Sequence, residues 1–445
     1  MKLNGIDTYW NPILETLPPI KLRALQFKKL KRMVDWAYEN SRLYRRRYDE
    51  EGFKPSELQK WEDIYKIPII QKEDFRNAQI REPWPYGESL SLPLEDITRF
   101  HQTTGATGQP VYMPDSWADW EVRTECWAYA LWAAGFRNTD RVFIPFGYNV
   151  YMGSWSGHYA AEKLGCEVVP GGILNTEERL LKMKELRANA FMATPTYVLK
   201  MADVCRNKLN MDPREMGIEK ILCSGEPGAS VPTTKKLLED AWNARVFDFV
   251  AATEVGGWAY ECSHQPGGLH ANEAYFLVEL MDIDTGDPIE ELHMPGKVVI
   301  TTLDRFGHPC IRFDSKDVGM WDKPCGCERS FRVLKGGVHG RVDHITKVKG
   351  VLFSPIAVDE VVRTIPELGN DYELIVTKEG PIDELILKVE MLPEATADQE
   401  AVKSKLSRQL RLKTTLHFEI EFHPFNTLKR PHIDVKRFKD FRDNK

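Results

Sequence analysis

The chain has 445 residues, enough for more than one domain, and carries 66 acidic against 60 basic side chains. This slight excess of negative charge argues against a nucleic-acid-binding protein, which concentrates positive charge to neutralise phosphates. No apolar run approaches the roughly 18 residues of a membrane span, and the start lacks the apolar core of a signal peptide. Eight scattered cysteines are typical of a reducing compartment. We therefore expect a cytoplasmic α/β enzyme that binds neither nucleic acid nor a membrane.

Residues 20–50 predict the first helix, because apolar side chains such as Leu22, Leu25, Leu30 and Met33 recur at near-helical spacing. Many basic residues lie between them. A basic amphipathic helix can lie on a membrane surface, but its basic face is more often simply solvated.

From Arg141 onward, short apolar runs alternate with helical segments. The expected strands are 142–145, 167–170, 190–193, 220–223 and 246–250. The expected helices are 158–164, 176–185, 197–207 and 231–243. Strands and helices that alternate at this spacing predict a mainly parallel sheet covered by helices.

After about Leu269 the chain becomes rich in β-strands, and its C-terminal part predicts a separate, small α+β unit. The expected strands are 275–281, 296–302, 311–313, 351–353, 373–377, 384–389 and 417–421. The expected helices of the small unit are 359–364 and 396–412. Thr396 is the expected N-cap of the second of these helices, with Gln399 in the capping-box position. We expect two domains, residues 1–342 and residues 343–445, separated near a polar stretch.

Residues 102–110, which read Gln-Thr-Thr-Gly-Ala-Thr-Gly-Gln-Pro, have the composition of a loop that wraps a phosphate. Glycines allow backbone N–H groups to approach a phosphate, and threonine hydroxyls add donors. The Lys-Ser/Thr ending of a Walker A loop is missing, and alone such a loop is more often an ordinary turn. The candidate phosphate-binding residues are Thr103, Thr104, Gly105, Thr107 and Gly108.

This loop resembles the phosphate-binding loop of the adenylate-forming superfamily, and nearly the whole chain resembles the phenylacetate–coenzyme A ligase family. Further segments are similar to family motifs and follow in the family's order. They are 148–153 with 158–165, 193–197, 224–228, 253–254, 311–317 and 340–343. The resemblance implies a large N-terminal domain that binds ATP and the acid, and a small C-terminal lid that rotates about Asp343.

The resemblance also implies roles for individual residues in forming an acyl-adenylate, a reaction in which positioning and charge neutralisation dominate. Glu254 would hold Mg²⁺, and Asp317 would accept hydrogen bonds from the ribose hydroxyls. Arg341 would lie at the hinge. The residues expected around the adenine are Ser224, Gly225, Glu226, Pro227, Ala252 and Thr253. Taken alone, Glu254 and Asp317 would more often be a capping acid and a turn acid.

Lys429 is the candidate for the lid lysine that contacts the attacking carboxylate and the α-phosphate in the family. A compact, mobile cation suits charge that moves from carboxylate to phosphate. Leu428 replaces the family's usual glycine, so Lys436 is the alternative, and a solvated basic tail is the alternative to both. The segment 349–353 would approach the pantetheine of coenzyme A.

Two features concern the acid and the adenine. Val250-Ala251 replaces the family's Tyr-Gly, and Phe249 should point to the opposite face of its strand, so aliphatic groups would flank the adenine. The expected acid pocket draws on Tyr148, Tyr151, Met152, Gly153 and Ala252. We expect aromatic and small side chains there and no cation, a lining suited to phenylacetate, indole-3-acetate or a benzoate.

The Cys325-Gly326-Cys327 pair could bind a metal together with upstream residues. Three cysteines and one histidine can complete a closed tetrahedral zinc site, whereas reduced cysteines near a turn are the ordinary alternative. Some relatives carry a similar cluster. The expected ligands are Cys262, His270, Cys325 and Cys327, with His264 competing for the histidine position.

We therefore predict an enzyme of aromatic compound degradation that ligates an aromatic acid to coenzyme A through an acyl-adenylate, using ATP and Mg²⁺ and releasing AMP and pyrophosphate. A structural Zn²⁺ and a homodimer are also expected. One alternative is an adenylyltransferase that acts on a cofactor without coenzyme A. The other is a non-catalytic, zinc-containing binding protein.

Overall fold

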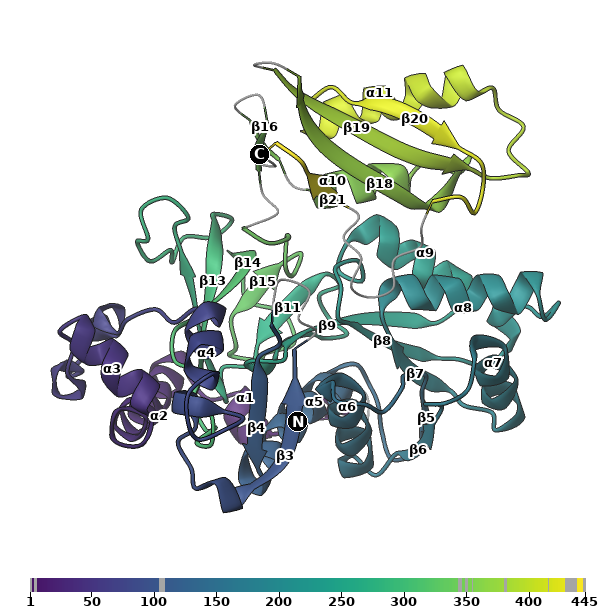
Figure 1. The fold of residues 1–445 in the computed structure, drawn as a ribbon. Coiled ribbons are helices and arrows are strands. Elements are labelled where there is room, and N and C mark those ends of the chain that lie inside the picture. Colours follow the sequence, from purple (N-terminus) through teal and green to yellow (C-terminus); the bar gives the residue numbers. More distant parts are fainter. Residues whose placement is uncertain are drawn as a thin grey trace. The chain divides into compact units, whose positions relative to one another are not determined.

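The computed structural model describes residues 2–3, 6–103, 109–342, 346–348, 351–353, 355–379, 382–414, 416–428 and 438–442 (Figure 1). The chain forms two compact units. One comprises Met1–Ser230 and Leu237–Val338, and the other comprises Val231–Lys236 and His339–Lys445. The domain limits expected from the sequence, 1–342 and 343–445, stay a prediction.

An eleven-stranded sheet organises the first unit, in the order β12-β13-β14-β15-β11-β10-β9-β8-β7-β5-β6 (Figure 1). The strands from β9 to β6 in this order are parallel, and the other neighbours are antiparallel. Their bounds are β5 (Arg141–Ile144), β6 (Glu167–Pro170), β7 (Ala190–Ala193), β8 (Lys220–Ser224), β9 (Arg245–Ala252), β10 (Gly256–Glu261), β11 (Gly268–Ala271), β12 (Phe276–Met281), β13 (Pro295–Thr302), β14 (Phe313–Asp322) and β15 (Val333–Lys335). The predicted α/β class is confirmed. The expected strand at 311–313 instead begins at Phe313 and runs to Asp322.

Helices cover both faces of the parallel strands, because successive side chains of a strand point to opposite faces. Val142 and Ile144 pack in one core with residues of α5 and α6, whereas Phe143 packs in another core with residues of α7, α8 and α9. The helices are α5 (Trp117–Ala133), α6 (Met152–Lys163), α7 (Thr176–Glu185), α8 (Pro195–Asn207) and α9 (Pro232–Trp242). Helix α6 begins six residues before the expected start at His158, so it includes part of the predicted acid segment.

The helix expected over 20–50 is two helices, α2 (Pro19–Asn40) and α3 (Arg42–Glu50). Ser41 separates them with an extended backbone, and its hydroxyl donates to the carbonyl oxygen of Glu88 at 2.9 Å. Leu30 and Met33 lie in the core, as the apolar spacing predicts. Among the described residues, no helix combines the length and the hydropathy needed to cross a bilayer.

Several smaller elements were not expected from the sequence. The most important for the site is α4 (Lys72–Gln79), together with the hairpin of β3 (Ile97–Gln102) and β4 (Tyr112–Ser116). The remaining short elements are β1 (Lys2–Leu3), β2 (Ile6–Asp7), α1 (Pro12–Glu15) and 3₁₀ turns at Pro55–Glu57, Trp61–Lys66, Gly87–Ser89, Leu94–Asp96 and Pro213–Glu215.

The N-terminal segment is attached to a loop more than three hundred residues away. Glu15 and Arg329 are buried and form an ion pair. The Tyr9 hydroxyl donates to the carbonyl oxygen of Cys327 at 2.9 Å. The backbone N–H of Ser330 donates to the carbonyl oxygen of Glu15 at 2.8 Å. We call these contacts the N-terminal clasp. They fix the loop that carries the Cys325–Cys327 pair.

The second unit contains a four-stranded sheet in the order β20-β19-β18-β21. Its elements are β16 (Thr346–Val348), β17 (Val351–Phe353), α10 (Pro355–Val362), β18 (Leu368–Glu379), β19 (Ile382–Met391), α11 (Gln399–Thr414), β20 (Glu419–His423) and β21 (Phe438–Asp440). Leu406 and Leu410 of α11 pack on Leu374 and Leu387 of the sheet. Because α11 begins at Gln399, the expectation that Thr396 is its N-cap is wrong.

Candidate active site

Four of the predicted site segments meet at one edge of the parallel sheet. The acid segment follows β5, the segment Thr194–Tyr197 follows β7, Ser224 ends β8 and Ala252 ends β9. These strands are parallel, so their carboxyl ends lie on the same edge. In open α/β sheets, ligands bind in the crevice outside the carboxyl ends of the strands. The topology therefore brings the expected adenine and acid segments together.

The loop after β8 is joined to the loop after β7. Gly225 has φ +93°, a left-handed conformation that glycine adopts readily, and an added Cβ would lie 3.5 Å from the Thr194 side chain. The Glu226 carboxylate accepts from the backbone N–H of Thr196 at 2.6 Å. Glu226 thus fixes the expected adenine loop to the start of α8, and Pro227 is the next residue of that loop.

Phe249 packs into the core beneath the adenine segment. Its ring centroid lies 4.4 Å from that of Trp127, in an edge-on arrangement. The next two residues on the strand, Val250 and Ala251, are half-buried and aliphatic. An aliphatic flank for the adenine stays our prediction.

Two hydrogen bonds between Thr103 and Val111 close the stem of the expected phosphate loop. The Thr103 N–H donates to the carbonyl oxygen of Val111 at 3.0 Å, and the Val111 N–H donates to the Thr103 hydroxyl at 2.9 Å. The hydroxyl of Thr103 is therefore already engaged as an acceptor. Thr104, Gly105, Thr107 and Gly108 lie outside the described residues.

Helix α4 holds the far side of this stem. The Arg76 guanidinium donates to the carbonyl oxygen of Gln109 at 2.9 Å. The Gln79 amide donates to the carbonyl oxygen of Pro110 at 2.6 Å and accepts from the N–H of Tyr112 at 3.0 Å. The two side chains thereby fix the point at which the chain leaves the loop.

The expected magnesium ligand, Glu254, is paired with the first residue of α4. The Lys72 ammonium lies 2.9 Å from the Glu254 carboxylate, and the two side chains are 30% and 7% exposed. The carboxylate is thus close to fully buried and already faces a cation. A magnesium ion that binds Glu254 must share or replace this partner, because both cations seek the same oxygens. Helix α4 consequently touches both the phosphate-loop stem and the candidate metal ligand.

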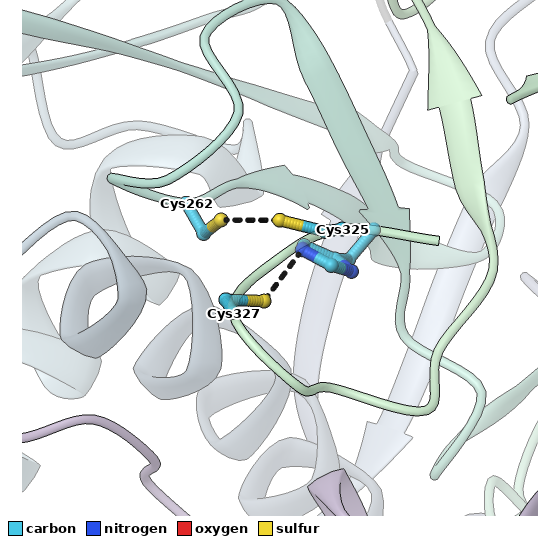
Figure 2. A group of neighbouring side chains, drawn as sticks. Cys262, Cys325 and Cys327 are labelled. Carbon is cyan, nitrogen blue, oxygen red and sulfur yellow. Dashed lines mark hydrogen bonds between the residues drawn. The ribbon is translucent and has the colours of Figure 1, made fainter. Parts of the chain in front are cut away.

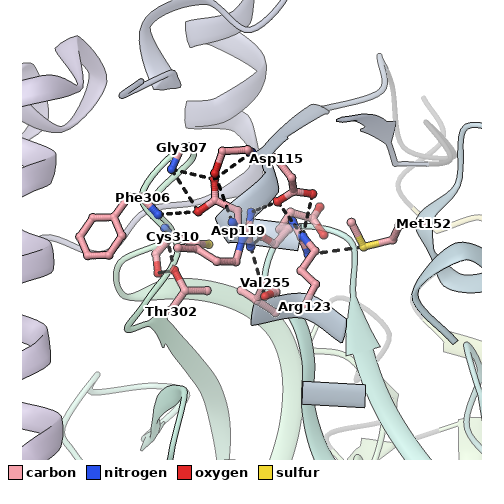
Figure 3. A network of polar contacts seen from close by, with 12 residues as sticks. Asp115, Asp119, Arg123, Met152, Val255, Thr302, Phe306, Gly307 and Cys310 are labelled. Carbon is pink, nitrogen blue, oxygen red and sulfur yellow. Dashed lines mark hydrogen bonds and ion pairs between the residues drawn. The ribbon is translucent and has the colours of Figure 1, made fainter. Parts of the chain in front are cut away.

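A buried polar network that includes Asp115, Asp119 and Arg123 (Figure 3) reaches the backbone of Glu254 through Arg305. Arg305 donates to the carbonyl oxygen of Glu254 at 2.8 Å, and its other end lies 3.4 Å from Asp115. Asp115 also accepts from Arg123 at 2.8 Å. Burial lowers the pKa of Arg123, and the positive charge of Arg305 lowers it further, whereas Asp115 raises it. The network positions the backbone of Glu254 rather than its carboxylate.

The acid segment has one neighbour that the sequence did not reveal. Met152 is buried at the start of α6, and its sulfur accepts from the Arg123 guanidinium at 3.4 Å (Figure 3). The expectation that no cation lies near this segment is wrong. Asp115 forms an ion pair with that cation at 2.8 Å. Tyr151 and Gly153 are exposed, and Tyr148 is half-buried with its hydroxyl 2.8 Å from His158.

The remaining predicted residues lie on β14, in the second unit or outside the described residues. Asp317 lies half-buried on β14, and its backbone N–H donates to the Ser315 hydroxyl at 3.1 Å. Arg341 is half-buried and belongs to the second unit. Lys429, Lys436, Asp343 and the residues Lys349 and Gly350 lie outside the described residues.

Four side chains converge on one point of the first unit (Figure 2). The ligand atoms of Cys262, His270, Cys325 and Cys327 all lie within 4.8 Å of one another, and all four residues are buried. Cys262 and Cys325 are 3.6 Å apart at sulfur, and the Cys327 sulfur is 3.4 Å from Nε2 of His270. Hydrogen bonds from the thiols of Cys262 and Cys325 lower the pKa of Cys327.

This geometry fits a tetrahedral metal. Zinc bonds of about 2.3 Å to sulfur place two thiolates about 3.8 Å apart, close to the observed separation. The other ring nitrogen of His270 lies 3.4 Å from the carbonyl oxygen of Phe331, an outer partner of the kind that orients a histidine ligand. His264, the competing histidine, is exposed and offers only its backbone N–H to the sulfur of Cys262, at 3.4 Å.

Sequence reasoning missed Lys72, Arg76, Gln79 and Arg305. Lys72 and Arg76 stand in a short, charged helix that reads as a solvated surface element, and nothing local marks their distant partners. Arg305 follows a strand and looks like a turn residue. Their roles depend on contacts between segments far apart in the chain.

Comparisons with known proteins bear on this arrangement. A family described as AMP-binding enzyme C-terminal domain matches residues 350–442. The chain is 33% identical to a phenylacetate–coenzyme A ligase of Thermus thermophilus over 387 residues, which is 86% of this chain and 84% of that protein. It is 31% identical to the phenylacetate–coenzyme A ligase of Aromatoleum evansii over 408 residues, 91% of this chain and 90% of that protein.

A solved structure agrees over nearly the whole chain. The crystal structure of 2-hydroxyisobutyryl-CoA ligase in the postadenylation state, in complex with 2-HIB-AMP, superposes with a TM-score of 0.92 and 27% identity. The match covers 99% of this chain and 94% of that one. The predicted family and the predicted enzyme class are confirmed. The chain belongs to the phenylacetate–coenzyme A ligase family, and it is an AMP-forming acyl-CoA ligase that works through an acyl-adenylate.

Proposed function

We propose that this ligase activates an aromatic monocarboxylic acid, with phenylacetate as the default and indole-3-acetate or a benzoate as close alternatives. The observation that carries this proposal is the aromatic wall of the acid segment. Tyr148 stands edge-on to Trp155, with ring centroids 4.9 Å apart, and edge-on to His158 at 5.6 Å. Flat rings pack well against such surfaces. The relatives named above are phenylacetate–coenzyme A ligases.

A short aliphatic hydroxy acid is the second candidate. The solved structure with a TM-score of 0.92 binds 2-HIB-AMP. Its fold agreement is high, but a shared fold leaves the side chains of the acid pocket free to differ. Substrate size therefore separates the two candidates.

The proposed mechanism assigns each reacting group a partner. The substrate carboxylate attacks the α-phosphate of ATP and pyrophosphate leaves, and the thiol of coenzyme A then attacks the acyl carbon and AMP leaves. Glu254 would hold Mg²⁺ on the phosphates, Asp317 would hold the ribose, and Lys429 would neutralise charge on the carboxylate and α-phosphate. The Thr103–Gly108 loop would bind the β- and γ-phosphates, with α4 fixing its stem.

A panel of acids in a pyrophosphate-release assay tests this assignment. Phenylacetate, indole-3-acetate, benzoate, 2-hydroxyisobutyrate and a straight-chain fatty acid should be compared by kcat/KM. We expect an aromatic acid to lead, and AMP release to require coenzyme A. Sustained AMP transfer without coenzyme A would favour the adenylyltransferase alternative. The homodimer and the cytoplasmic location stay predictions.

Acid selection should depend on size more than on charge. Asp115 and Asp119 together balance the charges of Arg123 and Arg305 behind Met152, so a distal carboxylate would be buried without a free cation. We expect aromatic dicarboxylic acids to be rejected, and one methylene more or less in a monoacid to change kcat/KM by roughly 10–200-fold. Gly153→Leu should favour smaller acids, because the leucine side chain would occupy part of the space expected for the acid. An added Cβ at Gly153 meets no atom within 4 Å, so the protein can accommodate the larger side chain. A dicarboxylic acid as the best substrate would contradict this reading.

We also propose that Cys262, His270, Cys325 and Cys327 hold a structural zinc ion. All four ligands come from the protein, which leaves no open position for chemistry. The N-terminal clasp supports the site, because it fixes the backbone of Cys327 through Tyr9. Zinc bound there would join β10, β11 and the loop after β14.

Metal analysis of protein purified without added metal should find about one zinc per chain, with or without ATP. Cys325→Ser should lose most of it and lower the melting temperature, since the binding energy of a structural zinc stabilises the fold. His264→Ala is the matched control and should retain the metal. Metal-free protein, or equal retention in Cys325→Ser, would refute the site.

A further inference from the structure

Three side chains form a hydrogen-bonded chain that begins at the acid segment. The Tyr148 hydroxyl lies 2.8 Å from Nδ1 of His158. Nε2 of the same ring lies 3.2 Å from the Glu162 carboxylate, one helical turn further along α6. Burial raises the pKa of Tyr148, so this hydroxyl keeps its proton. Glu162 is the exposed end of the chain, with 53% of its side chain accessible.

With an ionised carboxylate and a neutral imidazole, counting protons along this chain gives the direction of each hydrogen bond. An ionised carboxylate only accepts, so Nε2 of His158 must carry the proton that Glu162 accepts. In the neutral ring Nδ1 is then unprotonated and accepts the proton of the Tyr148 hydroxyl. That hydroxyl has one proton and has donated it. Its oxygen retains lone pairs and meets any further group as an acceptor alone.

We propose that His158 and Glu162 are positioning residues that reserve the Tyr148 oxygen as an acceptor, so that the enzyme prefers an acid with an N–H or O–H donor next to Tyr148 over a matched acid with an acceptor there. The inference rests on the proposed function in one respect, the placement of Tyr148 at the acid. An acid with a donor gains a hydrogen bond. An acid with an acceptor at the same place meets two facing lone pairs and loses affinity.

Matched pairs of acids test the preference. Indole-3-acetate and benzofuran-3-acetate differ in one ring atom, a donor N–H against an acceptor oxygen. Hydroxyphenylacetates and fluorophenylacetates supply the same contrast at each ring position. 2-Hydroxyisobutyrate and 2-fluoro-2-methylpropanoate supply it for an aliphatic acid. The readout is the ratio of kcat/KM within each pair, which cancels any general loss of activity in a variant.

We expect the wild-type protein to favour the donor by roughly 3–10-fold in at least one pair, the ratio that one neutral hydrogen bond supplies. His158→Phe frees the Tyr148 proton, so the ratio should fall toward one. Glu162→Gln is nearly isosteric, and its amide can donate to Nε2, which moves the ring proton to Nδ1. Tyr148 would then donate, and the ratio should fall or invert. Glu177→Gln changes an exposed carboxylate of α7 that pairs with Lys208; it is the control and should keep the wild-type ratio.

Each outcome decides between the inference and the proposed function. An unchanged ratio in both His158→Phe and Glu162→Gln, or no donor preference in the wild-type protein, overturns the inference. Should no aromatic acid be turned over, the proposed aromatic substrate is wrong, and the aliphatic pair then decides the donor preference by the same criterion. Because Glu162 is exposed, its variant remains informative even where His158→Phe fails to fold.

Discussion

Lys429→Ala is expected to abolish acyl-adenylate formation and to leave the transfer of a supplied acyl-adenylate to coenzyme A largely intact. The lysine would neutralise charge only while the carboxylate attacks the α-phosphate, and later steps would not need it. Removing one preorganised stabilising group typically costs a factor of about 10²–10³ in rate. Pyrophosphate release measures the first half-reaction, and thioester formation from synthetic acyl-adenylate measures the second.

Lys436→Ala is the matched control for this prediction, because the motif can be aligned in two registers. A selective defect in Lys436→Ala alone would show that the alternative register is right. Equal loss in both half-reactions would point to a general folding or binding defect. No loss in either variant would remove the lid lysine from the mechanism.

Glu254→Gln should lower kcat for pyrophosphate release by about 10²–10³-fold at saturating ATP and magnesium. The amide keeps the shape of the carboxylate and removes the charge that would hold Mg²⁺. The change also leaves Lys72 without its anionic partner, at 30% exposure, so water can still solvate it. We therefore expect little change in melting temperature.

The control for Glu254 is Asp212→Asn, a carboxylate in a surface pair with Arg214. This variant should keep full activity, because surface ion pairs contribute little. A titration with magnesium separates weaker binding from lost chemistry. Full rescue of Glu254→Gln by magnesium above the concentration that saturates the wild-type protein would reduce Glu254 to a secondary contact. Wild-type activity without rescue would exclude it as a ligand.

The parallel strands were the part of the fold most readily predicted from the sequence. The segments 167–170 and 190–193 match β6 and β7 residue for residue, and 176–185 matches α7. These elements are marked by local signals, short apolar runs for the strands and a capping box for the helix. The break at Ser41 could not be read in this way. It depends on a hydrogen bond to the backbone of Glu88, forty-seven positions away.

In the candidate site, too, the residues marked by local sequence signals were predicted, and those that depend on distant contacts were not. The cluster of Cys262, His270, Cys325 and Cys327 could be predicted from residue types alone. Few other cysteines or histidines lie close to these positions in the sequence. The ion pair of Lys72 with Glu254 joins residues that are 182 positions apart, and no periodic pattern in the sequence indicates it. Similarly, the cation behind Met152 comes from α5, a helix that the sequence analysis did not predict.

The N-terminal clasp has a consequence for synthesis on the ribosome. Tyr9 and its partner Cys327 are separated by 318 positions, and Glu15 and Arg329 by 314. At roughly 5–20 residues per second, the first helix waits roughly 15–60 s for the loop it must pack against. Until then Glu15, buried in the finished protein, remains solvated, and the first unit stays open at this seam. Chaperone dependence and sensitivity to truncation should therefore concentrate in the first fifteen residues rather than in the parallel strands, which pair with near neighbours.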